Sequence, residues 1–146
     1  MKRFSIIYFI LFFIIHMVWA SDENSGNSEE RMLLRAKRKV DNAKAGDWKT
    51  LADCANDLIK KGISSEDELE WINRSIALNE NIYNISLLGD YFILKREYKR
   101  AIENYLKAIQ LARIENNTEA IPTLQWKVLI TLGTQNYYKS LKDSGK

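Results

Sequence analysis

Pairs of carboxylates are the first candidates for chemistry in this 146-residue sequence. Glu66 and Glu70 lie one helical turn apart, and Glu29 and Glu30 are adjacent. Glycosidase-type catalysis needs two carboxylates across a pocket, one of them with a raised pKa. The sequence marks no such pocket and holds neither a phosphate-binding loop nor a cluster of metal-ligand residues. We therefore expect no enzyme, with no catalytic residue, no metal and no cofactor.

Histidine and cysteine narrow the chemistry further. The single histidine, His16, lies in an N-terminal segment that we expect to be removed. The mature chain would then have no imidazole for a catalytic triad, a metal site or a pH switch. The single cysteine, Cys54, cannot close an intramolecular disulfide. Its place in the helical pattern LADCANDL favours a small packing residue, with a reactive thiol or an intermolecular bridge as the alternative.

The N-terminus has the three parts of a secretory signal peptide. Lys2 and Arg3 form a basic start, an almost wholly apolar stretch covers residues 4–19, and small Ala20 precedes a polar sequence. We expect cleavage after Ala20 and export to the periplasm or the medium of a bacterium. Retention as a membrane anchor is the alternative, although the stretch is shorter than the ~20 residues of a spanning helix. The expected organisation is a signal peptide over 1–20, a flexible linker over 21–27 and a helical domain over 28–146.

The charge balance bears on the class of partner. The whole chain carries 22 Lys and Arg against 19 Asp and Glu, and loss of Lys2 and Arg3 leaves 20 against 19, a net charge of +1. Binding of nucleic acid generally needs a concentrated basic surface. We therefore expect another protein or a peptide as the partner, and no nucleic acid.

Helical patterns run through the remaining sequence, without the alternation of polar and apolar residues that is typical of strands. Gly46 and Gly62 are typical residues at helix ends. Asp47 would cap the following helix, and Ser65 with Glu68 matches a capping box. The sequence therefore predicts an all-α fold of about six helices, over residues 28–45, 48–61, 65–78, 82–95, 97–114 and 118–138.

The segment LLGDYFILKREYKRAIENYLKAIQL, residues 87–111, would form either one long helix or two short ones. Ile85, Leu88 and Phe92 define one apolar stripe, and residues 101–109 define a second one. The residues between the stripes, 95–97, contribute nothing to a core. A single helix would leave a broken stripe in water, so we predict two antiparallel helices packed stripe against stripe.

This helix pair resembles the tetratricopeptide repeat. The residues that carry the likeness are Leu88, Gly89, Phe92, Tyr98, Ala101, Tyr105 and Ala108. The resemblance implies that the three small residues allow the helices to approach closely, while the aromatic rings fill the space between them. It therefore implies a short solenoid of antiparallel helix pairs.

A weaker copy of the pattern precedes this pair, so we expect repeats at about 48–81 and 82–115. The copy has Glu68 at the place of Ala101. Near the C-terminus, Leu132 and Gly133 repeat the Leu-Gly pair, but no second helix follows them. Helices 28–45 and 118–138 would then act as caps.

The resemblance also implies a concave groove, lined by the first helix of each pair, that holds a peptide or a partner helix. We expect an interaction module or scaffold that acts outside the cytoplasm. Simple solvated polar residues are the alternative for each member of the predicted site. The predicted binding residues are Asp53, Asp57, Lys60, Tyr83, Ser86, Asp90 and Tyr137.

A second hypothesis is a structural subunit that self-associates through its C-terminal helix as a homo-oligomer. Trp126, Leu129, Ile130 and Leu132 would supply the contact. The alternative for these four residues is that they cover the core of their own domain. An uncleaved N-terminal segment would in addition associate the protein with a membrane.

Overall fold

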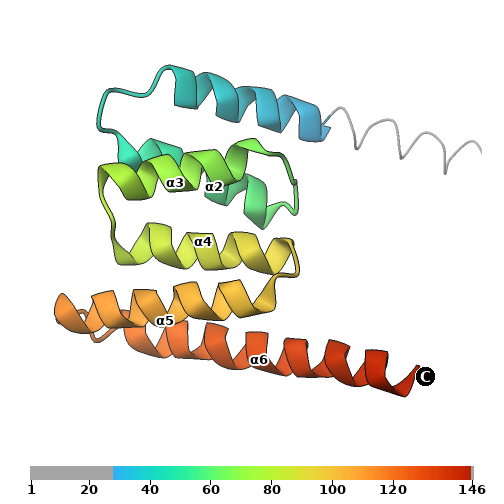
Figure 1. The fold of residues 1–146 in the computed structure, drawn as a ribbon. Coiled ribbons are helices and arrows are strands. Elements are labelled where there is room, and N and C mark those ends of the chain that lie inside the picture. The colour runs from blue at the N-terminus through green and yellow to red at the C-terminus, as the bar shows by residue number, and fades with distance from the viewer. Residues whose placement is uncertain (1–27, 146) are drawn as a thin grey trace, which may run out of the picture. The chain divides into compact units, whose positions relative to one another are not determined.

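The structure is a computed structural model that describes residues 28–145, and within this range it contains helices and no strand (Figure 1). Residues 28–41 are helical, and five helices follow: α2 (Trp48–Lys60), α3 (Asp67–Leu78), α4 (Ile82–Leu94), α5 (Tyr98–Ile114) and α6 (Ala120–Ser144). The predicted all-α class and its six helices are confirmed for these residues. The expected signal peptide and linker lie outside the described residues. No helix between residues 28 and 145 is long and apolar enough to span a bilayer.

The described residues divide into two units, 28–37 and 38–145. The described residues of the first unit, 28–37, belong to the N-terminal helix. The second unit contains α2 to α6, which follow one another as antiparallel neighbours (Figure 1). The core and the surfaces discussed below all belong to this second unit.

The helix boundaries follow the local signals in the sequence. The side chain of Asp47 accepts a hydrogen bond from the backbone N–H of Thr50 at 3.0 Å and thereby caps α2. The backbone N–H of Ser65 donates to Oε2 of Glu68 at 2.8 Å, as expected for a capping box. Gly62, directly after α2, adopts a positive φ of 68°, as is common at a helix C-terminus. The first helix ends at residue 41 rather than at the predicted 45, so Gly46, with a φ of 86°, lies in the turn before Asp47.

The segment 87–111 forms two helices, as predicted. The chain turns between α4 and α5 at Arg96, which has a φ of 59°, and the N–H of Glu97 bonds back to the carbonyl of Phe92 at 2.8 Å. Gly89 lies directly under the ring of Tyr105, because a Cβ at Gly89 would be only 2.4 Å from Cε1 of that ring. The close approach of the two helices therefore depends on this glycine.

Buried hydrophobic residues occur on all of α2 to α6, and one cluster of them joins α4, α5 and α6. Ile85, Ala108, Ile109 and Leu124 form its buried centre. The partly buried hydrophobic residues packed against them come from α3, α4, α5, the start of α6 and the middle of α6: Ile76, Ile82, Leu111, Ala120, Ile121 and Val128. The last helix is therefore anchored on the preceding pair through one of its sides.

Helix α6 begins close to Pro122, as predicted, but continues past the predicted end at about residue 138. The hydroxyls of Ser140 and Ser144 bond to carbonyls one turn earlier, and Lys142 lies in the last turn, where a cation complements the helix dipole. The ring of Tyr138 stacks on that of Tyr98, the first residue of α5, with centroids 5.9 Å apart. Because α5 and α6 are antiparallel, residues 139–144 extend beyond the first residue of α5 (Figure 1).

Candidate functional site

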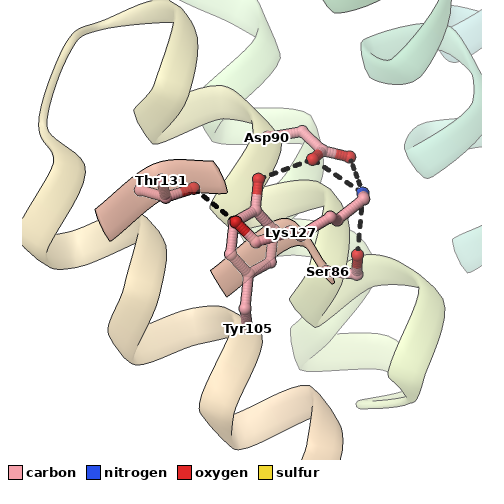
Figure 2. A network of polar contacts seen from close by, with 5 residues as sticks. All are labelled: Ser86, Asp90, Tyr105, Lys127 and Thr131. Carbon is pink, nitrogen blue, oxygen red and sulfur yellow. Dashed lines mark hydrogen bonds and ion pairs between the residues drawn. The ribbon is translucent and has the colours of Figure 1, made fainter. Parts of the chain in front are cut away.

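An ion pair between α4 and α6 lies at the centre of a polar network (Figure 2). Nζ of Lys127 is 2.7 Å from both carboxylate oxygens of Asp90 and 3.2 Å from Oγ of Ser86. The hydroxyl of Tyr105, on α5, donates to Oδ1 of Asp90 at 2.7 Å. One carboxylate therefore connects three consecutive helices.

The surroundings of this network favour the neutral phenol of Tyr105. The side chains of Lys127 and Asp90 are 31% and 30% exposed. Burial, together with the neighbouring carboxylate of Asp90, raises the pKa of Tyr105, so its hydroxyl remains protonated and donates. Nζ of Lys127 also lies 5.3 Å from the centre of the Tyr105 ring, within the range of a cation–π contact. Thr131 bonds through its hydroxyl to the carbonyl of Lys127 at 2.7 Å.

A second polar contact joins α2 to α4. The hydroxyl of Tyr83 donates to Oδ1 of Asp53 at 2.8 Å, and Nζ of Lys49 donates to Oδ2 at 2.6 Å. Burial of Asp53 opposes ionisation, but the hydrogen bonds from Lys49 and Tyr83 outweigh it and lower the pKa of the carboxyl. Burial and the bond to Asp53 raise the pKa of Tyr83.

The predicted groove residues therefore fall into two groups. The first group lies on α2 (Asp53) and α4 (Tyr83, Ser86 and Asp90), the first helices of the two expected repeats. The polar groups of these four residues form hydrogen bonds within the chain, which connect α2 to α4 and α4 to α6. Asp57 and Lys60 are exposed on α2. Tyr137 lies on the exposed side of α6 and meets the ring of Tyr138 edge-on at 5.6 Å. The structure does not bring the seven residues together into one site.

Sequence reasoning did not select Lys127, the residue that completes the main network. A signal for it exists, because Lys127 is the only charged residue between positions 120 and 138. A single cation in an otherwise uncharged helix needs a carboxylate partner wherever it is half-buried. The predicted groove residues include Asp90, so a search for the carboxylate that pairs with Lys127 could have identified this ion pair.

The exposed side of α6 is the most apolar surface in the described part of the chain. Twelve large hydrophobic side chains are exposed among residues 28–145, and seven of them belong to α6. Trp126 is 63% exposed and Leu129 is 60% exposed, whereas Leu124 and Thr131, which face the opposite way, are buried. The seven residues are Trp126, Leu129, Ile130, Leu132, Tyr137, Tyr138 and Leu141. The four predicted contact residues of the C-terminal helix therefore point mainly to solvent rather than into the core of their own domain.

The two Leu-Gly pairs differ in what covers them. A Cβ added at Gly89 would collide with Tyr105 of α5, whereas one added at Gly133 would meet nothing within 4 Å. Leu132, beside Gly133, is 39% exposed. The side of α6 that carries this pair thus has the sequence of a helix-packing surface, but no helix of residues 38–145 lies on it.

A small hollow borders this surface where α4, α5 and α6 meet. Its volume is about 170 Å³, below the ~300–1,000 Å³ of typical small-molecule sites. It has room for a side chain rather than for a cofactor. The hollow is lined by Ile93, Tyr98, Tyr105, Lys127, Ile130, Thr131 and Thr134.

The side chains considered above for nucleophilic or acid–base chemistry are buried or paired within the chain. Cys54 is buried, and burial raises the pKa of its thiol, which supports its interpretation as a packing residue rather than a reactive nucleophile. Glu68 is also fully buried and bonds to Ser65. Glu70 pairs with Arg74 on the exposed side of α3 at 3.3 Å.

Within residues 28–145, no three His, Cys, Asp or Glu side chains are grouped so that they could hold a metal ion. No protein-family model matches the chain, and no curated protein or solved structure is significantly similar to it.

Proposed function

We propose that this protein is a non-catalytic protein-interaction module and that the exposed side of α6 is its contact surface. The observation that carries the proposal is the concentration of seven exposed large hydrophobic residues on one helix. Large exposed apolar patches on soluble domains commonly mark interaction sites. The residues of the first helices are weaker candidates, because Asp53, Tyr83 and Asp90 already bond within the chain.

The helix pairs are proposed to be repeats of the tetratricopeptide kind. The close contact of Gly89 with Tyr105 and the complete burial of Ala101 and Ala108 support this assignment. Repeats of this kind bury each helix pair against its neighbours, and α6 has one side that no other described helix covers. Such an uncovered side is a natural place for a partner.

Action outside the cytoplasm is part of the proposal. The basic start at Lys2 and Arg3, the apolar stretch over residues 4–19 and the small Ala20 support export through a signal peptide. In that compartment Cys54 has no second cysteine in the chain to pair with, and its burial protects it from oxidation.

The test is crosslinking of the tagged protein in its native envelope, followed by mass spectrometry of what is captured. Three proteins are compared: the unchanged protein, Trp126→Glu on α6, and Asp57→Lys on the exposed side of α2. Asp57 is the better groove probe, because changing Asp53 would also remove the bonds to Lys49 and Tyr83. Circular dichroism of each variant establishes that its helices are retained.

The expected result is that Trp126→Glu abolishes a specific crosslink, either to another protein or to a second copy, and that Asp57→Lys preserves it. Loss of the crosslink in Asp57→Lys alone would overturn the proposal and would favour binding in the concave groove instead. The absence of any specific crosslink to the unchanged protein would overturn it as well.

A further inference from the structure

The exposed side of α6 carries a stripe of large and small residues at helical spacing, with the large ones mainly toward its start and the small ones mainly toward its end. Steps of four and three residues place its members on one side of a helix, as in the seam of a coiled coil. Three of these positions are large and exposed, and three are small and exposed. The stripe consists of Trp126, Ile130, Gly133, Tyr137, Ser140 and Ser144.

The order of sizes along the stripe is complementary to itself when reversed. In an antiparallel pair, Trp126 of one helix lies at the level of Ser144 of the second copy, and Ile130 lies at the level of Ser140. Gly133 lies at the level of Tyr137, and the same pairs recur in reverse order beyond the two-fold axis. Every large side chain therefore meets a small one, as knobs-into-holes packing requires. A parallel pair would instead set Trp126 against Trp126 and Tyr137 against Tyr137.

We propose that α6 pairs with α6 of a second copy in this antiparallel register, forming a two-fold symmetric dimer. This inference rests on the proposed function, because it names the partner of the same surface. A two-fold axis brings the same surface of both chains together, so self-complementarity is what such an interface requires.

The polar atoms on this side of α6 allow it to lose its water. The hydroxyl of Ser140 donates to the carbonyl of Tyr137 at 2.7 Å, and that of Ser144 donates to the carbonyl of Leu141 at 3.0 Å. Thr134, at the edge of the stripe, donates to the carbonyl of Ile130 at 2.9 Å. A second helix placed over these three hydroxyls would leave none of them without an acceptor.

The stripe itself carries no charge, because the charged residues of α6 occupy other sides of the helix. They are Lys127, which bonds to Asp90, and Lys139, Lys142 and Asp143 near the end of the helix. Two copies of this surface therefore meet without repulsion between like charges. A partner with a strongly charged surface would find nothing to pair with.

The length of α6 points to the same occupant. Its last residues extend past the first residue of α5, so Leu141 remains 48% exposed, without a neighbouring helix in the described chain. In the antiparallel register this projecting end, residues 139–144, lies along residues 126–131 of α6 of the second copy. Leu141 then lies at the level of Leu129 of that copy, which is also exposed.

The extent of the surface predicts a reversible dimer. The exposed parts of the large side chains on α6 amount to roughly 500 Å² per copy, if a fully exposed aromatic presents about 150–250 Å². A standard stable interface buries about 800 Å² per partner. Association is therefore expected to depend on protein concentration.

The first measurement is sedimentation of the purified protein over a range of concentrations. Ser140→Asp would bring a carboxylate against Ile130 of the second copy and should weaken the dimer at least tenfold. Ser140 lies beyond α5, so this change leaves the core of the domain intact. Gln125→Asp, also exposed on α6 but off the stripe, adds the same charge and should leave the dimer unchanged.

The second measurement determines the register by disulfide trapping in a Cys54→Ala background. Differently tagged Ile130→Cys and Ser140→Cys proteins are mixed and mildly oxidised. The antiparallel register predicts the mixed disulfide in preference to either homodimer. A parallel pair would give the two homodimeric disulfides instead.

A protein that stays monomeric at every concentration would overturn the inference, and so would a dimer that yields only the homodimeric disulfides. A monomer whose crosslink to another protein is still lost in Trp126→Glu would overturn the inference and leave the proposed function standing. A dimer that is insensitive to both Ser140→Asp and Trp126→Glu would overturn both.

Discussion

The α4–α5 pair and α6 carry the same Leu-Gly element in opposite situations. In α4, Gly89 lies beneath Tyr105, and the neighbouring ring of Phe92 is covered by Arg100 of α5 at 3.8 Å. In α6, the space above Gly133 is open, and the residue three positions later is an exposed Asn rather than an aromatic. The first element is filled within the chain, and the second is not.

This difference separates the role of a packing motif from its sequence. Small residues allow close approach only where another helix arrives, and elsewhere they leave a surface that is ready for one. The same sequence pattern is therefore a stability determinant in α4 and a candidate contact surface in α6. Substitutions at matched positions of the two regions should have different and sometimes opposite effects.

The largest difference is expected for an added charge. Ala108 is completely buried in the core between α4, α5 and α6, so Ala108→Arg combines overpacking with an unpaired buried charge. We expect a loss of more than about 3 kcal/mol in the free energy of unfolding. Ile130→Arg on the half-exposed side of α6 should change it by less than about 1 kcal/mol in the monomer.

Thermal unfolding followed by circular dichroism, at a protein concentration low enough to keep the chain monomeric, provides the comparison. Equal melting temperatures for Ala108→Arg and the unchanged protein would contradict the packing of α5 on α4.

The two glycines should respond to alanine with opposite signs. Tyr105 is buried and bonded to Asp90, so its ring cannot easily move away from a Cβ at Gly89. Overpacking should therefore exceed the gain in helix propensity, and Gly89→Ala should destabilise by about 1–2 kcal/mol. Gly133→Ala meets no neighbour and should stabilise the monomer by up to about 1 kcal/mol.

Urea denaturation of the two variants measures these changes. Stabilisation by both substitutions would mean that Gly89 is not in close contact with α5.

The network between α4 and α6 should contribute a smaller amount. Lys127→Met keeps the aliphatic part of the side chain but removes the ion pair with Asp90, and we expect a cost of about 1–2 kcal/mol because the pair is half-buried. Lys49→Met removes the more exposed pair with Asp53 and should cost at most about 0.5 kcal/mol. Equal costs in urea denaturation would show that the Lys127 network does not contribute specifically to holding α6.

Most of the fold was predictable from local signals. Caps, glycines and the change of apolar stripe at residues 95–97 defined the helices and the break between α4 and α5, because these features act within a few residues of the chain. The end of α6 was not predictable in this way. Residues 139–144 lack a neighbouring helix, so no apolar pattern marked them, and helix propensity with intrahelical bonds sustains the helix there.

The site was predictable only in part. The resemblance placed Asp53, Tyr83, Ser86 and Asp90 on the first helices of the pairs, which is where they lie. Whether a polar residue faces solvent or bonds to the next helix depends on tertiary contacts such as Lys127 to Asp90, which span a distance in sequence that no local pattern reports. The exposure of Trp126 and Leu129 likewise depends on the absence of a further helix over α6 in the described chain.

The α2–α3 pair combines features of both regions. As in the α4–α5 pair, the first helix is covered by a second one, but this second helix, α3, carries a buried Glu68 where α5 carries Ala101. Glu68 is completely buried: Oε2 accepts from Ser65 at 2.8 Å, and Oε1 has no hydrogen-bond partner among the described residues. Burial raises the pKa of this carboxyl above 4.5, although the bonds from Ser65 and the charge of Lys95 oppose the shift. The ionised form is therefore less stable in the folded state than in the unfolded one.

The smallest predicted effect follows from this shift. Because the folded state binds a proton at Glu68 at a higher pH than the unfolded state does, lowering the pH from neutrality through the folded pKa should stabilise the protein, until the gain levels off near 4.5. Glu68→Gln should remove this pH dependence while retaining a capping side chain, and Glu70→Gln on the exposed side of α3 serves as the matched control. The carboxyls of Asp47 and Asp53, whose pKa values are lowered, lose their stabilising effect as the pH falls below about 5. They are present in all three proteins, so their effect cancels in the difference between the unchanged protein and each variant. Urea denaturation at a series of pH values measures the difference between the unchanged protein and each variant. A difference for Glu68→Gln that does not vary with pH would mean that the carboxyl is hydrated, and that the α2–α3 pair opens at this position where α4–α5 stays closed around Ala101.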